Sequence, residues 1–316
     1  MISKLTQSIL MLTAHLSSNE TGTNPLTIKE WGKLADFLKE NKLSPEQLVN
    51  DDIESLLAGF SDPKITFPRL KKLLQRGTLL ALTSEKWLRS GLWILNRSEK
   101  EYPRKLKKRL GNNAPPIIFG FGNKNLLNQD KVLGCVGSRK VQNNHLIFSN
   151  DLGKLAADSG YSVISGAAKG VDESFMMGAL KSEGTAIGVV SDSLLQKGLS
   201  KLYRQYIERN DLVLISTFYP EAGFNVGNAM QRNKYVYCIS EAVIIPYSGN
   251  TGGTIAGALE NLKKQWVPTW VVKDNDKNSG NQEIVNAGAD WISQDISQIS
   301  FKKIFSSATR QGNFDF

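Results

Sequence analysis

The sequence contains few of the residues from which metal sites and many catalytic sites are built. Its 316 residues include two histidines and two cysteines. Cys135 and Cys238 lie among apolar neighbours without metal-ligand spacing, so we expect buried free thiols and no disulfide framework or zinc site. His15 and His145 are far apart in the chain, and they are too few for a Ser–His–Asp arrangement. We therefore predict no catalytic residues and no bound metal ion.

Long hydrophobic runs are also missing. The first ten residues carry one lysine, and the run that follows it is too polar for the apolar region of a signal peptide. No apolar stretch reaches the ~20 residues that a membrane-spanning helix needs. We expect a soluble, cytoplasmic protein that does not associate with membranes.

Acidic residues are too few to balance the basic ones. The formal net charge is +9, which favours an acidic partner such as nucleic acid. Between residues 96 and 112, seven lysines and arginines accompany only two acidic residues, so this segment holds more than half of the excess charge. Such a run is either a phosphate-facing patch or a solvated hinge.

Apolar periodicity divides the chain into four parts. Residues 1–95 show short amphipathic helical patterns, which predict a small helical domain. Residues 96–130 form a basic junction that includes a short edge strand near 116–121. In residues 131–292 strands alternate with helices, which is typical of an α/β, Rossmann-like, doubly wound and mainly parallel sheet. Residues 293–316 are a polar tail whose end we expect to be frayed.

The α/β part contains six predicted strands and five predicted helices. The strands are predicted at 132–136, 162–165, 185–190, 212–216, 242–246 and 267–272. The helices are predicted near 146–158, 173–183, 199–209, 225–237 and 254–264.

Three glycine-marked turns follow predicted strands of this domain, at 137–140, 165–170 and 251–254. Such turns expose backbone N–H groups and a helix N-terminus, which together attract phosphate. The carboxyl ends of parallel strands meet at one edge of a sheet, which is where open α/β sheets bind ligands. Three turns at that edge indicate a ligand with several phosphates.

The first turn combines a flexible backbone with polar and basic side chains. Gly137 permits close approach of a ligand to the backbone, and Ser138 offers a hydroxyl group. Arg139 is able to grip a phosphate with two hydrogen bonds, and Lys140 adds a second cation. The alternative is an ordinary glycine turn whose cations are solvated.

The second turn is built from small residues. Ser165, Gly166 and Gly170 keep the floor of a cleft open, and Lys169 would project toward a bound anion. Asp172 stands where the following helix begins, so we expect it to cap that helix. Neither this turn nor the first matches the G-x-G-x-x-G pattern, so we predict no nicotinamide cofactor, and no other cofactor is indicated.

Two further groups complete the predicted site. The third turn opens a helix, and its N–H groups and a threonine hydroxyl suit a phosphate or ribose oxygen; its members are Thr251, Gly252, Gly253 and Thr254. The second group lies in a helical segment and is expected either to contact phosphate and base edges or to be surface cations; its members are Arg232, Asn233 and Lys234.

These motifs together resemble the DprA/Smf family of DNA-processing proteins, over most of the chain. Residues 165–172, SGAAKGVD, closely resemble the family's S-G-x-A-x-G-[IV]-D motif. Residues 136–139 are similar to its first phosphate turn, and residues 232–234 to its R-N-R/K segment. The sequence departs from the family pattern at Glu173–Met176, where a histidine is usual, and at Ser216-Thr217, where Ser-Glu is usual.

The resemblance implies a Rossmann-like domain that binds single-stranded DNA, dimerises and performs no turnover chemistry. Family members help to load a RecA-type recombinase during DNA uptake, so we expect a single strand, a recombinase and a second copy of the chain as partners.

Two alternatives stay open. One is a nucleotide sensor or phosphoribohydrolase-like enzyme of the same superfamily, in a role such as phage defence. Its pattern, P-G-G-x-G-T-x-x-E, is partly matched by Gly252-Gly253-Thr254, but Gly257 stands in place of the glutamate, and Glu260 is nearby. The other alternative is a partner-binding scaffold that has lost its affinity for nucleic acid.

Overall fold

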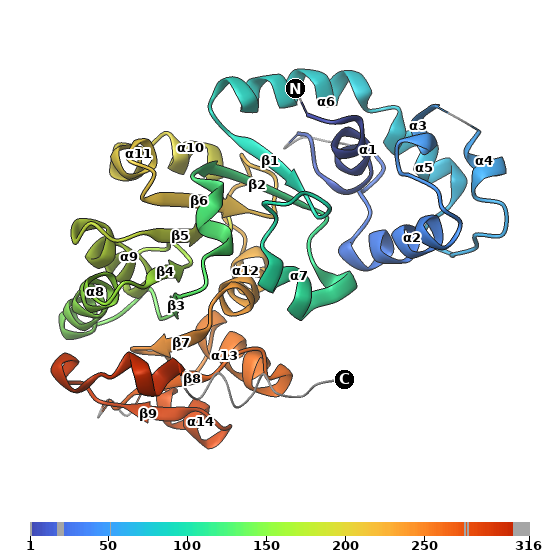
Figure 1. Cartoon of the computed structure of the whole chain (residues 1–316). Helices are drawn as coiled ribbons and strands as arrows, with labels where there is room; N and C mark the ends of the chain where they lie inside the picture. Colours follow the sequence, from blue (N-terminus) through green and yellow to red (C-terminus); the bar gives the residue numbers. More distant parts are fainter. Residues whose placement is uncertain (1, 18–21, 51, 275, 277, 306–316) are drawn as a thin grey trace.

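The computed structural model describes residues 2–17, 22–50, 52–274, 276 and 278–305, and a nine-stranded sheet forms its centre (Figure 1). The strands follow one another across the sheet in the order β1-β2-β6-β5-β4-β3-β7-β8-β9. The strands are β1 (Trp93–Asn96), β2 (Ile117–Gly122), β3 (Val132–Cys135), β4 (Ser162–Ser165), β5 (Ala186–Val189), β6 (Leu212–Ser216), β7 (Ala242–Ile245), β8 (Thr269–Val272) and β9 (Asp290–Ile292).

The sheet is doubly wound, as predicted. Strands β3 to β9 run parallel to one another. The chain moves outward from β3 through β4 and β5 to β6, and it then returns to the opposite side of β3 with β7, β8 and β9. The winding direction therefore reverses between β3 and β7, and this reversal creates a crevice at the carboxyl ends of the two strands.

Helices cover both faces of the sheet, so each face has its own hydrophobic core. Alternate residues of a strand pack into one core or the other. Leu133 packs in the same core as helices α8 and α9 and the N-terminal helices, whereas Val132 packs with α7, α12, α13 and α14. The bounds are α7 (Arg104–Leu110), α8 (Asn143–Asp158), α9 (Val171–Lys181), α10 (Leu194–Gly198), α11 (Lys201–Glu208), α12 (Val226–Ile239), α13 (Gly253–Lys264) and α14 (Asn281–Asn286). The six predicted strands and five predicted helices all occur, within a few residues of their predicted ends.

The prediction of an edge strand near 116–121 was wrong. Strand β2 lies there, but it pairs antiparallel with β6 on one side and with β1 on the other. The edge strand on this side of the sheet is β1, which contains four residues and follows a helix after a short turn, so it is too short to interrupt the helical pattern. It begins at Trp93, inside the range that we expected to be wholly helical.

The N-terminal part is otherwise helical, and its helices pack directly on the sheet. The side chain of Trp87 is fully buried, and its ring meets that of Phe119 edge-on at 5.2 Å. Its indole nitrogen donates a hydrogen bond to Glu221, 3.2 Å away. The helices are α1 (Lys4–Thr13), α2 (Ile28–Glu40), α3 (Gln47–Asn50), α4 (Ile53–Leu56), α5 (Phe67–Leu74) and α6 (Gly77–Arg89).

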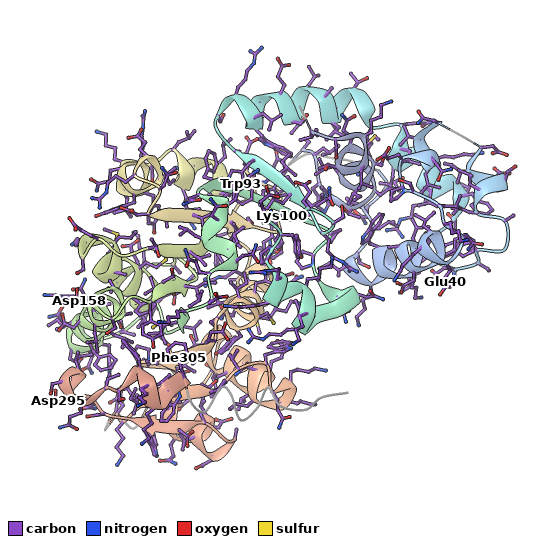
Figure 2. The ribbon with its side chains drawn as sticks, in the orientation of Figure 1. Glu40, Trp93, Lys100, Asp158, Asp295 and Phe305 are labelled. Carbon is purple, nitrogen blue, oxygen red and sulfur yellow. The ribbon has the colours of Figure 1, made fainter. Side chains whose placement is uncertain are left out.

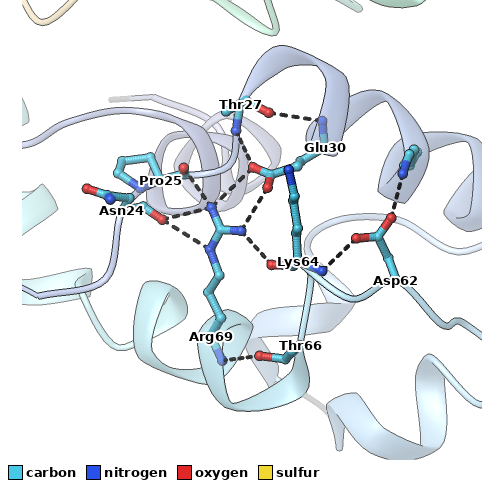
Figure 3. A network of polar contacts seen from close by, with 9 residues as sticks. Asn24, Pro25, Thr27, Glu30, Asp62, Lys64, Thr66 and Arg69 are labelled. Atoms are coloured by element: carbon cyan, nitrogen blue, oxygen red, sulfur yellow. Dashed lines mark hydrogen bonds and ion pairs between the residues drawn. The ribbon is translucent and has the colours of Figure 1, made fainter.

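A single arginine joins the loops of this helical part (Figure 3). The Arg69 guanidinium donates to the main-chain oxygens of Asn24 and Lys64, and it pairs with Glu30 at 3.0 Å. Burial would raise the pKa of Glu30, but hydrogen bonds from Arg69 and Thr27 outweigh it and lower that pKa. The same carboxylate completes a capping box with Thr27 at the start of α2.

The first residues of the predicted tail are packed on the domain. Phe301 and Ile304 are buried, and the ring of Phe305 stacks on that of Tyr161 with the centroids 4.6 Å apart. The end of the tail, for which we predict fraying, lies outside the described residues. Among the residues that are described, no helix has both the length and the apolar character needed to cross a bilayer.

Candidate functional site

The three glycine-marked turns meet at one edge of the sheet. The first follows β3, the second follows β4, and the third lies between β7 and α13. Strands β4, β3 and β7 are adjacent and parallel, so their carboxyl ends lie side by side. The turns thus surround the crevice where the winding direction changes, as the sequence predicts.

Two cavities open at this edge. The first, of about 520 Å³, lies between the first turn, the third turn and α12. The second, of about 660 Å³, lies beside it over the second turn and the segment after β5. Ten predicted site residues line the first cavity: Gly137, Ser138, Arg139, Lys140, Arg232, Asn233, Thr251, Gly252, Gly253 and Thr254. Gly166 and Lys169 line the second, and Arg139 and Arg232 line both.

Three predicted site residues line neither cavity. The Ser165 hydroxyl is buried and donates to the main-chain oxygen of Cys135 at 2.6 Å. Gly170 is the N-cap residue of α9 and is not among the residues that line the cavities. Lys234 lies further along α12, with its ammonium group 5.4 Å from the centre of the Tyr235 ring. We infer that Ser165 and Gly170 shape the turn and do not contact a ligand.

A buried ion pair lies beneath the cavities. Arg232 is 3% exposed and Asp172 is 5% exposed, and Arg232 Nη1 lies 3.0 Å from Asp172 Oδ2. The other carboxylate oxygen accepts a hydrogen bond from the Gly137 backbone N–H at 3.2 Å. Asp172 thus links the first turn, the start of α9 and the middle of α12.

The prediction that Asp172 caps a helix was wrong. The N-cap position of α9 is Gly170, and Asp172 is the second residue inside the helix. Its carboxylate extends across the sheet edge to Gly137 and Arg232, and no cap hydrogen bond from its side chain occurs. Spacing along the chain could not reveal this, because both partners come from other elements.

Two glycines provide the space for this arrangement. A Cβ atom on Gly166 would lie 0.9 Å from Arg232 Nη1, so no other residue fits there while the arginine keeps its place. A Cβ atom on Gly137 would lie 2.5 Å from the Val171 side chain. We expected these glycines to leave room for a ligand, but the room is largely filled by the protein's own side chains.

Hydrogen bonds join the first turn to the segment just before the third turn, and they join α12 to the third turn itself. The Gly249 N–H donates to the Ser138 hydroxyl oxygen, and the Ser138 N–H donates to the Tyr247 carbonyl, each at 3.0 Å. The Asn233 side-chain amide donates to the Gly253 carbonyl, also at 3.0 Å. These bonds fix the spacing of the turns without a ligand, and a preformed site of this kind avoids ordering costs on binding.

The sequence reasoning missed Phe224, which stands between the two cavities and lines both. Its side chain is 55% exposed, and the Arg139 guanidinium carbon lies 4.6 Å from the centre of its ring. Val226 and Met230 are also exposed and line the first cavity. The sequence did contain a signal for Phe224, because it is an aromatic residue within the glycine- and asparagine-rich run 223–228.

Lys197 was also missed, and it lines the second cavity together with two acidic residues, Glu173 and Asp192. Burial lowers its pKa, while its neighbour Asp192, 3.4 Å away, opposes that shift. Arg139 and Arg232 lie near enough to lower it further. A bound anion would relieve the repulsion among these cations.

The two cysteines are buried free thiols, as predicted. Burial raises the pKa of Cys238 to about 12, and it raises that of Cys135 well above the ordinary value. Both thiols are therefore protonated at neutral pH and unreactive. In the part of the chain that the structure covers, no three histidine, cysteine or acidic side chains are grouped to hold a metal ion.

Comparison with known proteins places this geometry in a family. The family described as DNA recombination-mediator protein A matches residues 93–302, more than half of the chain. The chain belongs to this family. Its match to the DNA processing protein DprA of Bacillus subtilis (strain 168) is 27% identical over 180 residues, which are 55% of this chain and 58% of that protein. The chain thus spans under two thirds of that relative's length.

Two solved structures of the family share the fold. DNA processing protein A from Streptococcus pneumoniae superposes with a TM-score of 0.69 at 17% identity, over 94% of this chain and 96% of that one. The Helicobacter pylori protein, described for its single-stranded DNA binding mode, gives a TM-score of 0.54 at 21% identity, over 69% of this chain and 96% of that one. The likeness extends over the doubly wound sheet that carries the site.

Replacing Asp172 with alanine is expected to destabilise the protein by about 3–5 kcal/mol, because it leaves the Arg232 charge buried and unpaired. Chemical denaturation monitored by circular dichroism measures the loss. The double variant Asp172→Ala/Arg232→Met should recover part of it, since no charge then remains buried. A stability equal to that of the native chain in Asp172→Ala would show that the pair does not support the fold.

Proposed function

We propose that the two cavities bind single-stranded nucleic acid, in particular DNA. The observation that carries the proposal is the position of Arg139 and Phe224 on the ridge between two cavities lined by phosphate-attracting turns. Arginine suits the phosphate groups of the backbone, and an exposed aromatic ring suits the face of a base. A strand that crosses this ridge would contact both cavities.

Charge supports the proposal. Among the described residues, no carboxylate pairs with Arg139, Lys140 or Lys169, and the last two are exposed. Asp172 is the one acidic residue among those lining the first cavity, and Arg232 already neutralises it. Arg139, Lys140 and Lys169 are thus available to a ligand, whereas Arg232 and Lys197 already have carboxylate partners.

A single strand fits this site better than a duplex. Proteins recognise single strands by stacking unpaired bases on aromatic rings and following the backbone with a positive groove. Phe224 offers such a ring between the two cavities. The bases of a duplex are already paired and stacked, so they cannot stack on it. The H. pylori relative is described for its single-stranded DNA binding mode, which agrees with a single strand as the ligand.

The family description suggests a wider role, and we include it in the proposal. As a recombination mediator, the chain would load a RecA-type recombinase onto the strand that it holds, during DNA uptake or processing. It would act through binding and without turnover chemistry.

We also propose that the chain forms a homodimer. Helices α13 and α14, the loop after α13 and strand β9 leave apolar side chains half-buried, in contact with the core beneath. Large apolar side chains at this exposure are typical of surfaces that a second subunit covers. These side chains are Leu259, Leu262, Trp266, Val285 and Trp291.

The phosphoribohydrolase-like alternative finds less support. Gly257 stands where that activity needs a glutamate, and a Cβ atom there would lie 3.3 Å from the Asn233 side chain and 3.5 Å from the Tyr237 ring. Glu260 is exposed and lines neither cavity. Of the carboxylates that line the cavities, Asp172 is held by Arg232 and Asp192 pairs with Lys197, and neither they nor Glu173 stands at the position of the pattern's glutamate.

Replacing Lys169 with glutamate should weaken binding of single-stranded DNA on the order of tenfold and lower the salt dependence, because one phosphate contact is lost and a repulsive charge is added. Fluorescence anisotropy with single-stranded DNA, duplex DNA and RNA at two salt concentrations measures this. Lys181→Glu, an exposed change at the end of α9, is the matched control. Unchanged affinity in Lys169→Glu would show that the second turn is only structural.

Replacing Phe224 with alanine should weaken binding of single strands by about 1–3 kcal/mol, the usual value of one base stacked on an aromatic ring. Phe224→Tyr should keep most of the affinity. Leu199→Ala, at a similarly exposed apolar residue, controls for general surface effects. Since the ring is largely exposed, the melting temperature should change little. Equal affinities of Phe224→Ala and the native chain would exclude stacking on this ring.

Sedimentation equilibrium is expected to give twice the chain mass of 34.9 kDa. Leu262→Glu should shift the equilibrium toward the monomer, because it places a charge on the half-buried apolar surface. Leu82→Glu, on the exposed side of α6, is the control. A native chain that stays monomeric at micromolar concentration would contradict the dimer.

A further inference from the structure

The structure divides the seven cations of residues 96–112 into two groups. Three of them are used within the protein. Arg97 donates to the Gly111 carbonyl at 3.2 Å, and Lys105 forms an ion pair with Glu241. Arg109 donates to the Cys238 carbonyl at 3.0 Å, and so caps the last turn of α12.

The other four cations are exposed, and we call them the α7 basic face. They are Lys100, Arg104, Lys107 and Lys108. Lys100 lies in the turn between β1 and α7 (Figure 2). The other three stand at positions i, i+3 and i+4 of α7, which places them on one side of the helix, opposite the buried Leu106. Within the described chain, none of the four pairs with a carboxylate.

Stability does not explain the α7 basic face. Like charges three or four residues apart on a helix destabilise it by about 0.2–0.5 kcal/mol per pair. Arg104 lies in the first turn of α7, where a cation opposes the helix dipole and no acidic residue accompanies it, whereas the dipole favours Lys107 and Lys108 in the last turn. The arrangement has an unfavourable self-energy that an external polyanion would relieve.

We propose that the α7 basic face binds the sugar–phosphate backbone of a nucleic-acid strand that continues beyond the cavities. The inference rests on the proposed function and adds a second contact surface to it. Protein partners generally need apolar or aromatic anchors at the centre of their interface. This face offers none, because Leu106 and Tyr102 are buried, whereas backbone binding requires only cations.

Helix α12 sets the distance between the two surfaces. Its first half, including Met230, lines the first cavity, and its last carbonyls are capped by Arg109 of α7. Figure 1 shows α7 beside α12. From Met230 to Tyr237 the rise along the helix is about 10 Å. Lys234 lies between these two points, and we expect the strand to run past it. Only a strand longer than the stretch that the cavities hold can therefore reach the α7 basic face.

The test neutralises three members of the face in Arg104→Gln/Lys107→Gln/Lys108→Gln. Its matched control is Lys72→Gln/Lys154→Gln/Lys181→Gln, which removes three exposed charges from α5, α8 and α9. Each protein is titrated with single-stranded DNA of about four and about twenty nucleotides, which bracket the usual site sizes. Fluorescence anisotropy at several salt concentrations gives affinity and salt slope, and thermal unfolding gives stability.

We expect the triple variant to bind the short strand as the native chain does. Its affinity for the long strand should fall on the order of tenfold, and the slope of log K against log salt should become shallower by about 2, since single strands contribute about 0.7 per phosphate. Its melting temperature should be unchanged or higher, because repulsion on α7 is removed. The control should match the native chain on both strands.

Three results would overturn the inference. If the triple variant keeps native affinity and slope on the long strand, the face does not bind the backbone, although the cavities still do. If both strands weaken equally, or if the control weakens as much, the effect reflects net charge and not this surface. If the native chain binds neither strand, the proposed function fails and the inference fails with it.

Discussion

The architecture of the site depends on the buried ion pair between Arg232 and Asp172. Two charges removed from water are costly unless each is fully paired, so the surrounding residues are constrained to keep them together. Gly166 must lack a side chain to admit the guanidinium, and Gly137 supplies a backbone N–H to the carboxylate. Through this pair the first turn, the second turn and α12 hold one geometry, and the ridge of Arg139 and Phe224 stands above it.

The same constraint divides the basic residues by task. Arg232 is paired with Asp172 inside the protein. Lys105 and Arg109 of α7 are likewise used internally, the first in an ion pair with Glu241 and the second in a hydrogen bond to the end of α12. At the cavities and on the α7 basic face, by contrast, exposed cations have no carboxylate partner among the described residues; they are Arg139, Lys140, Lys169, Lys100, Arg104, Lys107 and Lys108. The net charge of +9 therefore does not show how the paired and the exposed basic residues are distributed over the protein. A protein that works by holding a polyanion benefits from such separation, because internal pairs preserve the fold when the ligand leaves.

Much of the fold was predictable from the sequence because parallel strands covered on both faces are continuous apolar runs. Strands such as β6 and β7 stand out between helical patterns, and their order places the three turns at one edge. Strand β1 was not predictable, since four residues after a helix carry no period of their own. Of the site, the turns and Arg139 were recognised from local patterns, whereas Phe224 was not, because its importance comes from its exposure between two cavities.

The sequence alone determined the type of sheet, the positions of the glycine-marked turns and the resemblance to the DNA-processing family. These features are local, and short-range chemistry specifies them. Only the tertiary structure decided what each charged residue does. Arg232 and Asp172 are 60 positions apart and meet because β3, β4 and α12 converge, and Arg109 meets the end of α12 for the same reason. Whether a cation is free or paired depends on neighbours that the chain brings together only by folding.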